Sequence, residues 1–191
     1  MDKETFLKQS KMLKKQIVDI SDIKLKGKTL DLGGGGEGII LQLKNNNTVA
    51  IDLSEDELKE TPDYGLKIVM DAKDLKFLDN YFETVTAFFS LMYIPKKDHK
   101  KVFKEAYRVL KKNGEFHIWD VKMPQKEEGK IGFIVPLEVK IKEKTIETGY
   151  GVFWKKEQSI KYYEELAKEL GFKVETKEEY NETFYIKLIK E

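Results

Sequence analysis

A glycine-rich turn between two acid-ended apolar runs constrains the fold of this chain more than any other feature. The first run is Thr29–Leu32, which carries Asp31, and five glycines fall within residues 33–38. The second run begins at Val49 and ends at Asp52. This order predicts a strand, a glycine turn, a short helix and a second strand that ends in an acid. In such a unit the turn approaches a nucleoside closely and the second acid holds the ribose diol, so the sequence predicts a cofactor that contains adenosine.

The composition is typical of one globular domain. The chain has 191 residues, of which 40% are hydrophobic and 36% are charged, and this is enough for a compact core. The formal net charge of +1 gives no overall field that would attract nucleic acid or anionic lipid. The longest apolar run, residues 85–94, is too short to span a bilayer, and the charged N-terminus does not resemble a signal peptide. We therefore expect a cytoplasmic protein that contacts no membrane.

Predicted strands and helices alternate through the first two thirds of the chain. This alternation predicts an α/β fold, with a mostly parallel sheet and helices on both of its faces. The apolar runs predict strands over residues 28–32, 49–53, 66–70, 85–92 and 115–119. Helical spacing of apolar residues predicts helices over residues 3–20, 37–43, 97–112 and 157–170.

The end of the chain departs from this alternation. Predicted strands over 172–176 and 183–189 are joined by a connection that is too short for a parallel crossover, so we expect an antiparallel last strand. The chain contains no linker or repeat, which predicts a single domain over residues 1–191. We divide it into a helical cap (1–26), a cofactor-binding core (27–120), an inserted β-hairpin (129–154), and the last helix and strands (155–191).

The inserted segment 129–154 has the pattern of a long β-hairpin. Its odd-numbered residues from Ile131 to Ile141 are all apolar, and strict alternation resumes after a turn at residues 143–144. Two strands alone are only marginally stable in water, so the apolar face must pack on something. Two alternatives stay open. The hairpin extends the domain or contacts the second subunit of a homodimer, or it covers an acceptor pocket and excludes water from it through Tyr150, Phe153 and Trp154.

Two adenosine-containing cofactors compete for the glycine turn. Gly33, Gly35 and Gly38 satisfy the spacing G-x-G-x-x-G, and Asp52 lies 19 residues after the first of them. Both features fit a nicotinamide dinucleotide site.

The distribution of acids favours the other cofactor. Glu37 lies near the start of the following helix, where its charge would repel a pyrophosphate bound at the helix N-terminus. In addition, Asp31, Asp52 and Asp71 stand at the ends of three successive predicted strands. S-adenosylmethionine has no phosphate and carries an ammonium and a sulfonium group, so its site tolerates acids.

Four segments resemble the class I S-adenosylmethionine-dependent methyltransferases. TLDLGGGGEG (29–38) is similar to the first motif of the family, and VAIDLS (49–54) is similar to its ribose-binding strand. Residues 69–94 resemble the adenine strand and the fourth strand, and FKEAYRVLKKNGEFHIWD (103–120) resembles the helix, glycine and strand that follow. The resemblance covers residues 27–120, is closest to the branch that methylates small molecules, and implies a Rossmann-like fold. One departure is Glu37, which stands where the family usually has a third glycine.

The resemblance implies that nine residues hold S-adenosylmethionine. Asp31 would orient the turn and favour the ammonium group, and Asp52 would accept hydrogen bonds from the ribose hydroxyls. Asp71 would accept from the adenine amino group, and Ala72 would donate its backbone N–H. Five further residues would make the remaining contacts, which are those with the methionine and ribose parts, the adenine ring and the methyl donor. They are Gly33, Gly34, Gly35, Leu53 and Ser90.

The residues that contact the methyl acceptor are less well defined. Methyl transfer needs a positioned nucleophile and a dry pocket more than a dedicated base, so no catalytic base is assigned. Tyr93, just past the fourth predicted strand, and Asp120, at the end of the fifth, are candidates for contact with the acceptor. His117 is expected to be packed or solvent-facing, and His99 is expected to be solvated. The chain has no cysteine and no acid directly after the fourth strand, so we expect no metal.

The sequence therefore predicts a methyltransferase that uses S-adenosylmethionine and acts on a small molecule. Two alternatives remain: a methyltransferase that acts on protein or RNA, and a scaffold protein that binds the cofactor without turnover. The lysine-rich stretch 96–101 is interpreted as an exposed helix face, because the nearly neutral net charge argues against nucleic acid.

Overall fold

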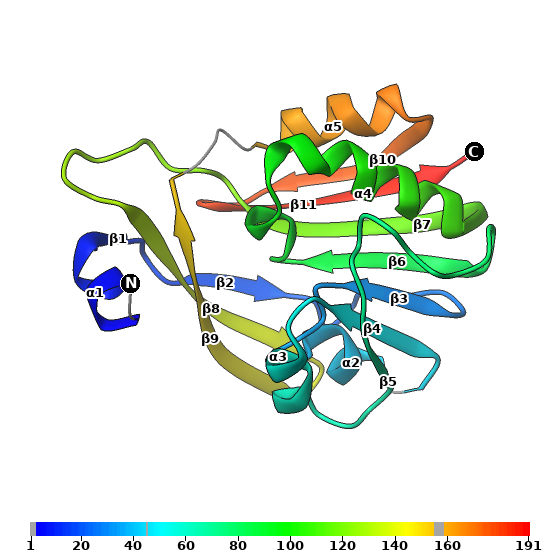
Figure 1. The fold of residues 1–191 in the computed structure, drawn as a ribbon, viewed down its shortest axis with the longest axis horizontal. Helices are drawn as coiled ribbons and strands as arrows, with labels where there is room; N and C mark the ends of the chain where they lie inside the picture. Colours follow the sequence, from blue (N-terminus) through cyan, green and yellow to red (C-terminus); the bar gives the residue numbers. More distant parts are fainter. Residues whose placement is uncertain (1–2, 45, 155–158) are drawn as a thin grey trace.

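A seven-stranded sheet forms the centre of the fold (Figure 1). The computed structural model describes residues 3–44, 46–154 and 159–191. The strand order is β10-β11-β7-β6-β3-β4-β5. The strands are β3 (Thr29–Leu32), β4 (Thr48–Asp52), β5 (Leu66–Val69), β6 (Phe82–Phe88), β7 (Leu110–Val121), β10 (Phe172–Glu179) and β11 (Thr183–Lys190).

The sheet is mostly parallel, as predicted. Strands β5, β4, β3, β6 and β7 run parallel to one another. Strand β11 is antiparallel to both β7 and β10, and it lies between them. The prediction of an antiparallel last strand is therefore confirmed. Because the parallel strands share one direction, their carboxyl ends meet at one edge of the sheet, where ligands bind in open α/β sheets.

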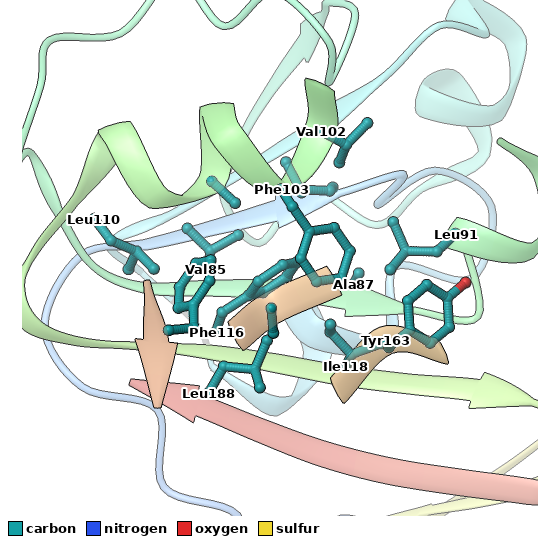
Figure 2. Close-up of a cluster of buried hydrophobic side chains, with 14 of the residues drawn as sticks. Val85, Ala87, Leu91, Val102, Phe103, Leu110, Phe116, Ile118, Tyr163 and Leu188 are labelled. Atoms are coloured by element: carbon teal, nitrogen blue, oxygen red, sulfur yellow. The ribbon is translucent and has the colours of Figure 1, made fainter. Parts of the chain in front are cut away.

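Two helices cover one face of this sheet (Figure 1). They are α4 (Lys96–Val109) and α5 (Ile160–Glu169). Phe103 of α4 stacks on Tyr163 of α5 with their ring centroids 5.8 Å apart, and both rings are fully buried. Figure 2 shows these rings beside Val85 and Phe116 of the sheet. This cluster forms the core between the main sheet and its two covering helices.

A second, smaller sheet contains the predicted hairpin. Its central strand is β8 (Gly132–Ile141), which pairs antiparallel with β9 (Lys144–Phe153). On its other edge β8 pairs in parallel with β1 (Ser10–Met12) and β2 (Gln16–Asp19). The inserted hairpin is therefore confirmed, and the N-terminal segment completes its sheet.

The second sheet packs on the opposite face of the main sheet from α4 and α5. Phe133, Val135 and Leu137 of β8 are fully buried, in one cluster with residues of α2 (Ile39–Leu43) and with Trp119 of β7. The apolar stripe predicted for the hairpin is thus part of the core, which fits the alternative in which the hairpin extends the domain. The short helix α3 (Glu55–Glu60) follows β4.

The predicted helix over residues 3–20 is wrong beyond Gln9, so the segment 1–26 is not a helical cap. Helix α1 covers only Lys3–Gln9, and β1 and β2 follow it. Val18 is 4% exposed whereas Ile17 is 57% exposed, which is the alternation of a strand. The apolar spacing fits a helix, but β8 offers a pairing edge, and β-branched residues favour a strand there.

Two predicted boundaries also change. The fourth strand was predicted to reach residue 92, but β6 ends at Phe88 because Phe89 has a left-handed φ of 50°, and residues Leu91–Tyr93 form a 3₁₀ helix, η1. The helix predicted over 97–112 ends at Val109, and β7 begins directly after it.

Candidate functional site

A cavity of about 660 Å³ opens at the carboxyl edge of the main sheet. Residues at the ends of β3, β4 and β6, the glycine turn and part of β9 form its wall. The structure brings together all nine residues that the sequence assigned to the cofactor. The cavity is lined by Asp31, Gly33, Gly34, Gly35, Asp52, Leu53, Asp71, Ala72 and Ser90. Their individual contacts with a ligand stay predictions.

Asp31 is the most deeply placed acid of this wall. It lies in β3, is 2% exposed, and its Oδ1 accepts a hydrogen bond of 2.7 Å from the hydroxyl of Thr86. Burial and the nearby charge of Asp52 raise the pKa of Asp31 to about 7, against the opposing effect of the Thr86 hydrogen bond. The carboxyl group therefore titrates near neutral pH, and a cation in the cavity would favour its charged form.

The turn after β3 requires glycine for steric reasons. Gly33 has a φ of +70°, and a Cβ there would lie 2.5 Å from the Cβ of Ser90. A Cβ on Gly34 would lie 2.6 Å from Oδ2 of Asp31. The backbone N–H groups of Gly33 and Gly34 donate to the carbonyl of Ile51, at 2.8 and 3.0 Å. The turn is thus held against β4, and its backbone reaches the cavity without intervening side chains.

Asp52 is held at the end of β4 by two backbone donors. Its Oδ2 accepts from the N–H of Gly35 at 3.3 Å, and its Oδ1 accepts from the N–H of Ser54 at 2.9 Å. Ser54 caps α3 by accepting from the N–H of Glu57. These bonds fix the carboxylate toward the cavity, where it can accept hydrogen bonds from a diol.

Asp71 occupies the corresponding position after β5. Its Oδ1 accepts from the backbone N–H of Lys73 at 2.9 Å, and the ammonium group of Lys73 lies 3.5 Å from its Oδ2. Ala72 lies between them and also lines the cavity. Leu53 is 68% exposed and lies at the rim. The second and third acids of the sequence pattern therefore lie at adjacent strand ends, as predicted.

Strand β9 closes the cavity on the side of the hairpin. The carboxylate of Glu37, in the glycine turn, accepts hydrogen bonds from the hydroxyls of Thr148 and Tyr150, the second at 3.4 Å. The ring of Tyr150 stacks on Phe89, with centroids 5.7 Å apart, and meets the edge of Tyr93 at 6.5 Å. Glu37 and Phe89 were not predicted as site residues. In the sequence, the one feature that pointed to Glu37 was that an acid stands where the family usually has a glycine.

Comparison with known proteins tests the resemblance found in the sequence. Residues 30–118 match the family model described as a methyltransferase domain. A ubiquinone/menaquinone biosynthesis C-methyltransferase of Rickettsia typhi is 38% identical over 109 residues, which cover 48% of this chain and 43% of the relative. Both matches bear out the resemblance of this chain to the class I S-adenosylmethionine-dependent methyltransferases. A sterol 4-C-methyltransferase of Caenorhabditis elegans is 31% identical over 48% of this chain and 30% of its own length. The chain thus spans less than half the length of these curated relatives.

Solved structures share the fold of this chain. A protein of Pyrococcus horikoshii superimposes with a TM-score of 0.66 and 23% identity, over 90% of this chain and 86% of its own. An S-adenosylmethionine-dependent methyltransferase of Methanosarcina mazei gives a TM-score of 0.64 and 18% identity, over 88% and 94% of the two chains. At these identities the likeness concerns the fold alone.

The cavity fits S-adenosylmethionine, the cofactor of the class I methyltransferases, better than a dinucleotide. Among the described residues that line it, Lys73 is the one positive side chain, and it is engaged with Asp71. Six residues bring carboxyl groups: Asp31, Glu37, Asp52, Glu57, Glu60 and Asp71. Carboxylates attract an ammonium or a sulfonium and repel a pyrophosphate, so the donor set suits the cationic cofactor.

The two candidates for acceptor contact lie in different places in the structure. Tyr93 is 54% exposed and lines the cavity, and its contact with an acceptor stays a prediction. Asp120 is fully buried instead, and it accepts hydrogen bonds from the Tyr163 hydroxyl at 3.3 Å and from the N–H of Val121 at 2.8 Å. It is outside the lining of the cavity, so the expectation that Asp120 contacts the acceptor is corrected. Asp120 points into the core because the hydroxyl of Tyr163, on α5, donates a hydrogen bond to its carboxylate there.

Both histidines are buried. His117 is packed in β7, 2.8 Å from the Tyr185 hydroxyl and 3.1 Å from the Glu115 carboxylate, as expected for a packed residue. The prediction that His99 is solvated is wrong, because its side chain is fully buried. Its Nε2 lies 3.0 Å from the carbonyls of Leu91 and Ile94. His99 therefore holds η1, the turn that presents Tyr93 to the cavity.

Of the three aromatic residues predicted to cover the acceptor pocket, one lines the cavity. Tyr150 lines the cavity, as does its neighbour Gly149. Phe153 instead packs against Phe6, with ring centroids 4.8 Å apart, and Trp154 donates its indole N–H to the carbonyl of Pro124. Side chains alternate along β9, so Tyr150 and Phe153 lie on different faces of the strand.

Two further observations bear on the site and its surroundings. No group of three or more His, Asp or Glu side chains is placed to hold a metal ion within the described ranges. No helix in the same part of the chain is long and apolar enough to cross a membrane.

Proposed function

We propose that this protein transfers the methyl group of S-adenosylmethionine to a small-molecule acceptor. The observation that carries the proposal is the single cavity that gathers the glycine turn, the acids of three strand ends and Tyr93. Two of the similar proteins are named for C-methylation in ubiquinone/menaquinone biosynthesis and of a sterol, which supports an acceptor of small size.

Each part of the wall has a role that follows from its chemistry. When bound, the cofactor supplies a methyl group on a cationic sulfur, which an acceptor nucleophile displaces in line. Asp52 and Asp71 would hold the nucleoside from two strand ends, and Asp31 would face the cationic part. Tyr150, stacked on Phe89, excludes water from the hairpin side. Orientation and exclusion of water are the main contributions that a protein can make to such a displacement.

We expect Asp52→Ala to weaken cofactor binding by about tenfold or more. Charge-assisted hydrogen bonds to the ribose hydroxyls contribute roughly 1.5–3 kcal/mol each, and about 1.4 kcal/mol corresponds to a factor of ten. Calorimetric titration with S-adenosylmethionine and S-adenosylhomocysteine measures this change. Asp56→Ala, in the first turn of α3 with its side chain 92% exposed, is the matched control. Equal affinities of the two variants would contradict the role of Asp52, and binding of NAD at similar affinity would contradict the choice of cofactor.

We also expect methyl transfer to persist in EDTA. The sequence places no acid directly after the fourth strand and has two histidines and no cysteine. Transfer of labelled methyl groups with and without the chelator measures this. Activity that is lost in EDTA and restored by added Mg²⁺ would contradict the prediction.

The same assay separates the remaining alternatives for the acceptor. Label that enters small organic compounds of a cell extract supports the proposal, and label confined to RNA or protein supports a macromolecular acceptor. Cofactor binding without transfer to any fraction would favour the scaffold alternative.

A further inference from the structure

The cavity holds more acids than the cofactor needs. The proposed function uses Asp31, Asp52 and Asp71 and leaves Glu37, Glu57 and Glu60 on the same wall. Glu57 lies next to the glycine turn, where its backbone carbonyl accepts from the N–H of Gly36 at 2.9 Å. Burial and the surrounding acids raise the pKa of Glu57, so the charges crowd one another there. Repulsion among these carboxylates costs free energy, and a positively charged ligand in the cavity would offset that cost.

Three aromatic residues that contact one another line the cavity. Phe89, Tyr93 and Tyr150 all line it, and they are joined by the stacked and edge-on contacts of Tyr150. The face of an aromatic ring attracts a cation within about 6 Å of its centre, and the attraction grows when water is excluded. Rings beside a carboxylate, here Glu37, are a recurrent way of binding ammonium groups.

The charges near the two tyrosine hydroxyls point the same way. The side chain of Tyr93 is 54% exposed overall, but loss of hydration at its hydroxyl, together with the carboxylates of Asp120, Glu37 and Glu57, raises its pKa. Burial and the charge of Glu37 raise the pKa of Tyr150. A field that disfavours a phenolate on the protein disfavours an anionic acceptor in the same place, such as a carboxylate or a phenolate, and favours a cation.

We infer that the methyl acceptor is a small organic amine that binds as a cation, with its ammonium group against Tyr93 and Tyr150 and with Glu37 as its counter-charge. Because an ammonium group has no lone pair, its nitrogen first gives one proton to the Glu37 carboxylate, and the free amine then takes the methyl group and leaves S-adenosylhomocysteine. This inference rests on the proposed function, because it concerns the space that the cofactor leaves in the same cavity. Glu37 has a double task here: it fixes Tyr150 through the hydroxyl hydrogen bond, and it supplies the charge. Glu37, which stands where the family usually has a glycine, would therefore help to select a cationic acceptor.

A pair of probes of equal shape tests the charge preference. Choline and its uncharged isostere 3,3-dimethylbutan-1-ol are titrated into the full chain saturated with S-adenosylhomocysteine, and binding is followed by ligand-observed NMR. We expect choline to bind at least about tenfold more tightly, which corresponds to about 1.4 kcal/mol. Equal binding of the two probes, or binding of neither, would overturn the inference.

Variants locate the preference within the cavity. Glu37→Gln keeps an oxygen acceptor for Thr148 and Tyr150 but removes the charge, and Tyr150→Leu removes the ring. Both are expected to abolish the advantage of choline while S-adenosylhomocysteine still binds. Glu147→Gln is the control, because Glu147 lies next to Thr148 on β9 but pairs with Lys15 at 2.9 Å, outside the cavity lining. An unchanged preference in Glu37→Gln would overturn the inference, as would a loss of S-adenosylhomocysteine binding in that folded variant.

A transfer assay distinguishes sources of the amine. Labelled S-adenosylmethionine is supplied with organic amines, with quinols and phenols, and with a lysine-rich peptide. We expect label in the small amines. Label in quinols or phenols alone, or in the peptide alone, would overturn the inference, although it would leave methyl transfer itself intact. Failure of S-adenosylhomocysteine to bind the unaltered protein would instead contradict the proposed function.

Discussion

Replacing Asp31 with asparagine is expected to stabilise the free protein at pH 8 by roughly 4 kcal/mol and to weaken cofactor binding at the same time. The carboxyl group is buried, and its pKa is about 7 in the fold against 3.8 as the ordinary value. A shift of one unit corresponds to 1.36 kcal/mol, which gives the order of magnitude. Asparagine keeps the oxygen that accepts from Thr86 and carries no charge to bury.

The sign of the pH dependence follows from proton binding. Between pH 4 and pH 7 the folded protein binds a proton at Asp31 that the unfolded chain has lost, so stability falls as the pH rises through this range. Above about pH 7 both states are ionised and the penalty stays constant. The advantage of Asp31→Asn is therefore small near pH 4 and greatest at pH 8. Urea unfolding at a series of pH values measures it.

Cofactor binding is expected to change in the opposite direction. Charged Asp31 favours a cation, so the affinity of the unaltered protein for S-adenosylmethionine should rise with pH up to about 7, whereas the Asp31→Asn variant should bind more than tenfold more weakly and show no such rise. Asp56→Asn, a change at a side chain that is 92% exposed, should alter stability by less than about 0.5 kcal/mol at every pH. An Asp31→Asn variant that is less stable at pH 8 would contradict the buried charge.

The cofactor wall was predictable from the sequence because local rules determine it. Acids at the ends of parallel strands meet at one edge whatever the rest of the chain does, so the positions of Asp31, Asp52 and Asp71 along the sequence were enough to place them together. The conformation of Gly33, with its φ of +70°, is likewise a local requirement of the turn. These features do not depend on a distant partner.

The predictions that were wrong concern residues whose structure depends on partners far away in the sequence. Residues 10–20 have apolar positions that suit a helix, and only the edge of β8, more than a hundred residues later, makes them strands. Asp120 was expected in the site because it ends a strand, but Tyr163 of α5 draws it into the core. Glu37 was recognised as a departure from the family, but its partners Thr148 and Tyr150 come from the hairpin.

The hairpin also differs from a detachable cover, which changes how its role can be tested. Residues Phe133, Val135, Leu137 and Val139 of β8 are fully buried in one of the two main clusters. A chain without residues 129–154 would expose the opposite half of that cluster, including Trp119, so loss of activity would report unfolding. Single substitutions at Tyr150 or Glu37 are therefore the sharper test of a cover, because they leave β8 in place.

Phe133→Ala is expected to destabilise the protein by about 3–5 kcal/mol, the range for truncating a fully buried phenylalanine. Its ring is 0% exposed and packs with Trp154 at 5.7 Å between centroids. Phe153→Ala, in the same hairpin at a site that is 41% exposed, is the matched control and should cost about 1 kcal/mol or less.

The two tryptophans make this measurement informative about the whole fold. Trp119 lies in the main sheet, and Trp154 follows β9, and the chain has no other tryptophan. If the hairpin is part of one cooperative core, urea unfolding of single-tryptophan variants gives the same midpoint at both positions, and Phe133→Ala lowers both midpoints equally. A lower midpoint at Trp154 alone, or equal costs for Phe133→Ala and Phe153→Ala, would show that the hairpin folds on the domain as a separate, weakly attached unit.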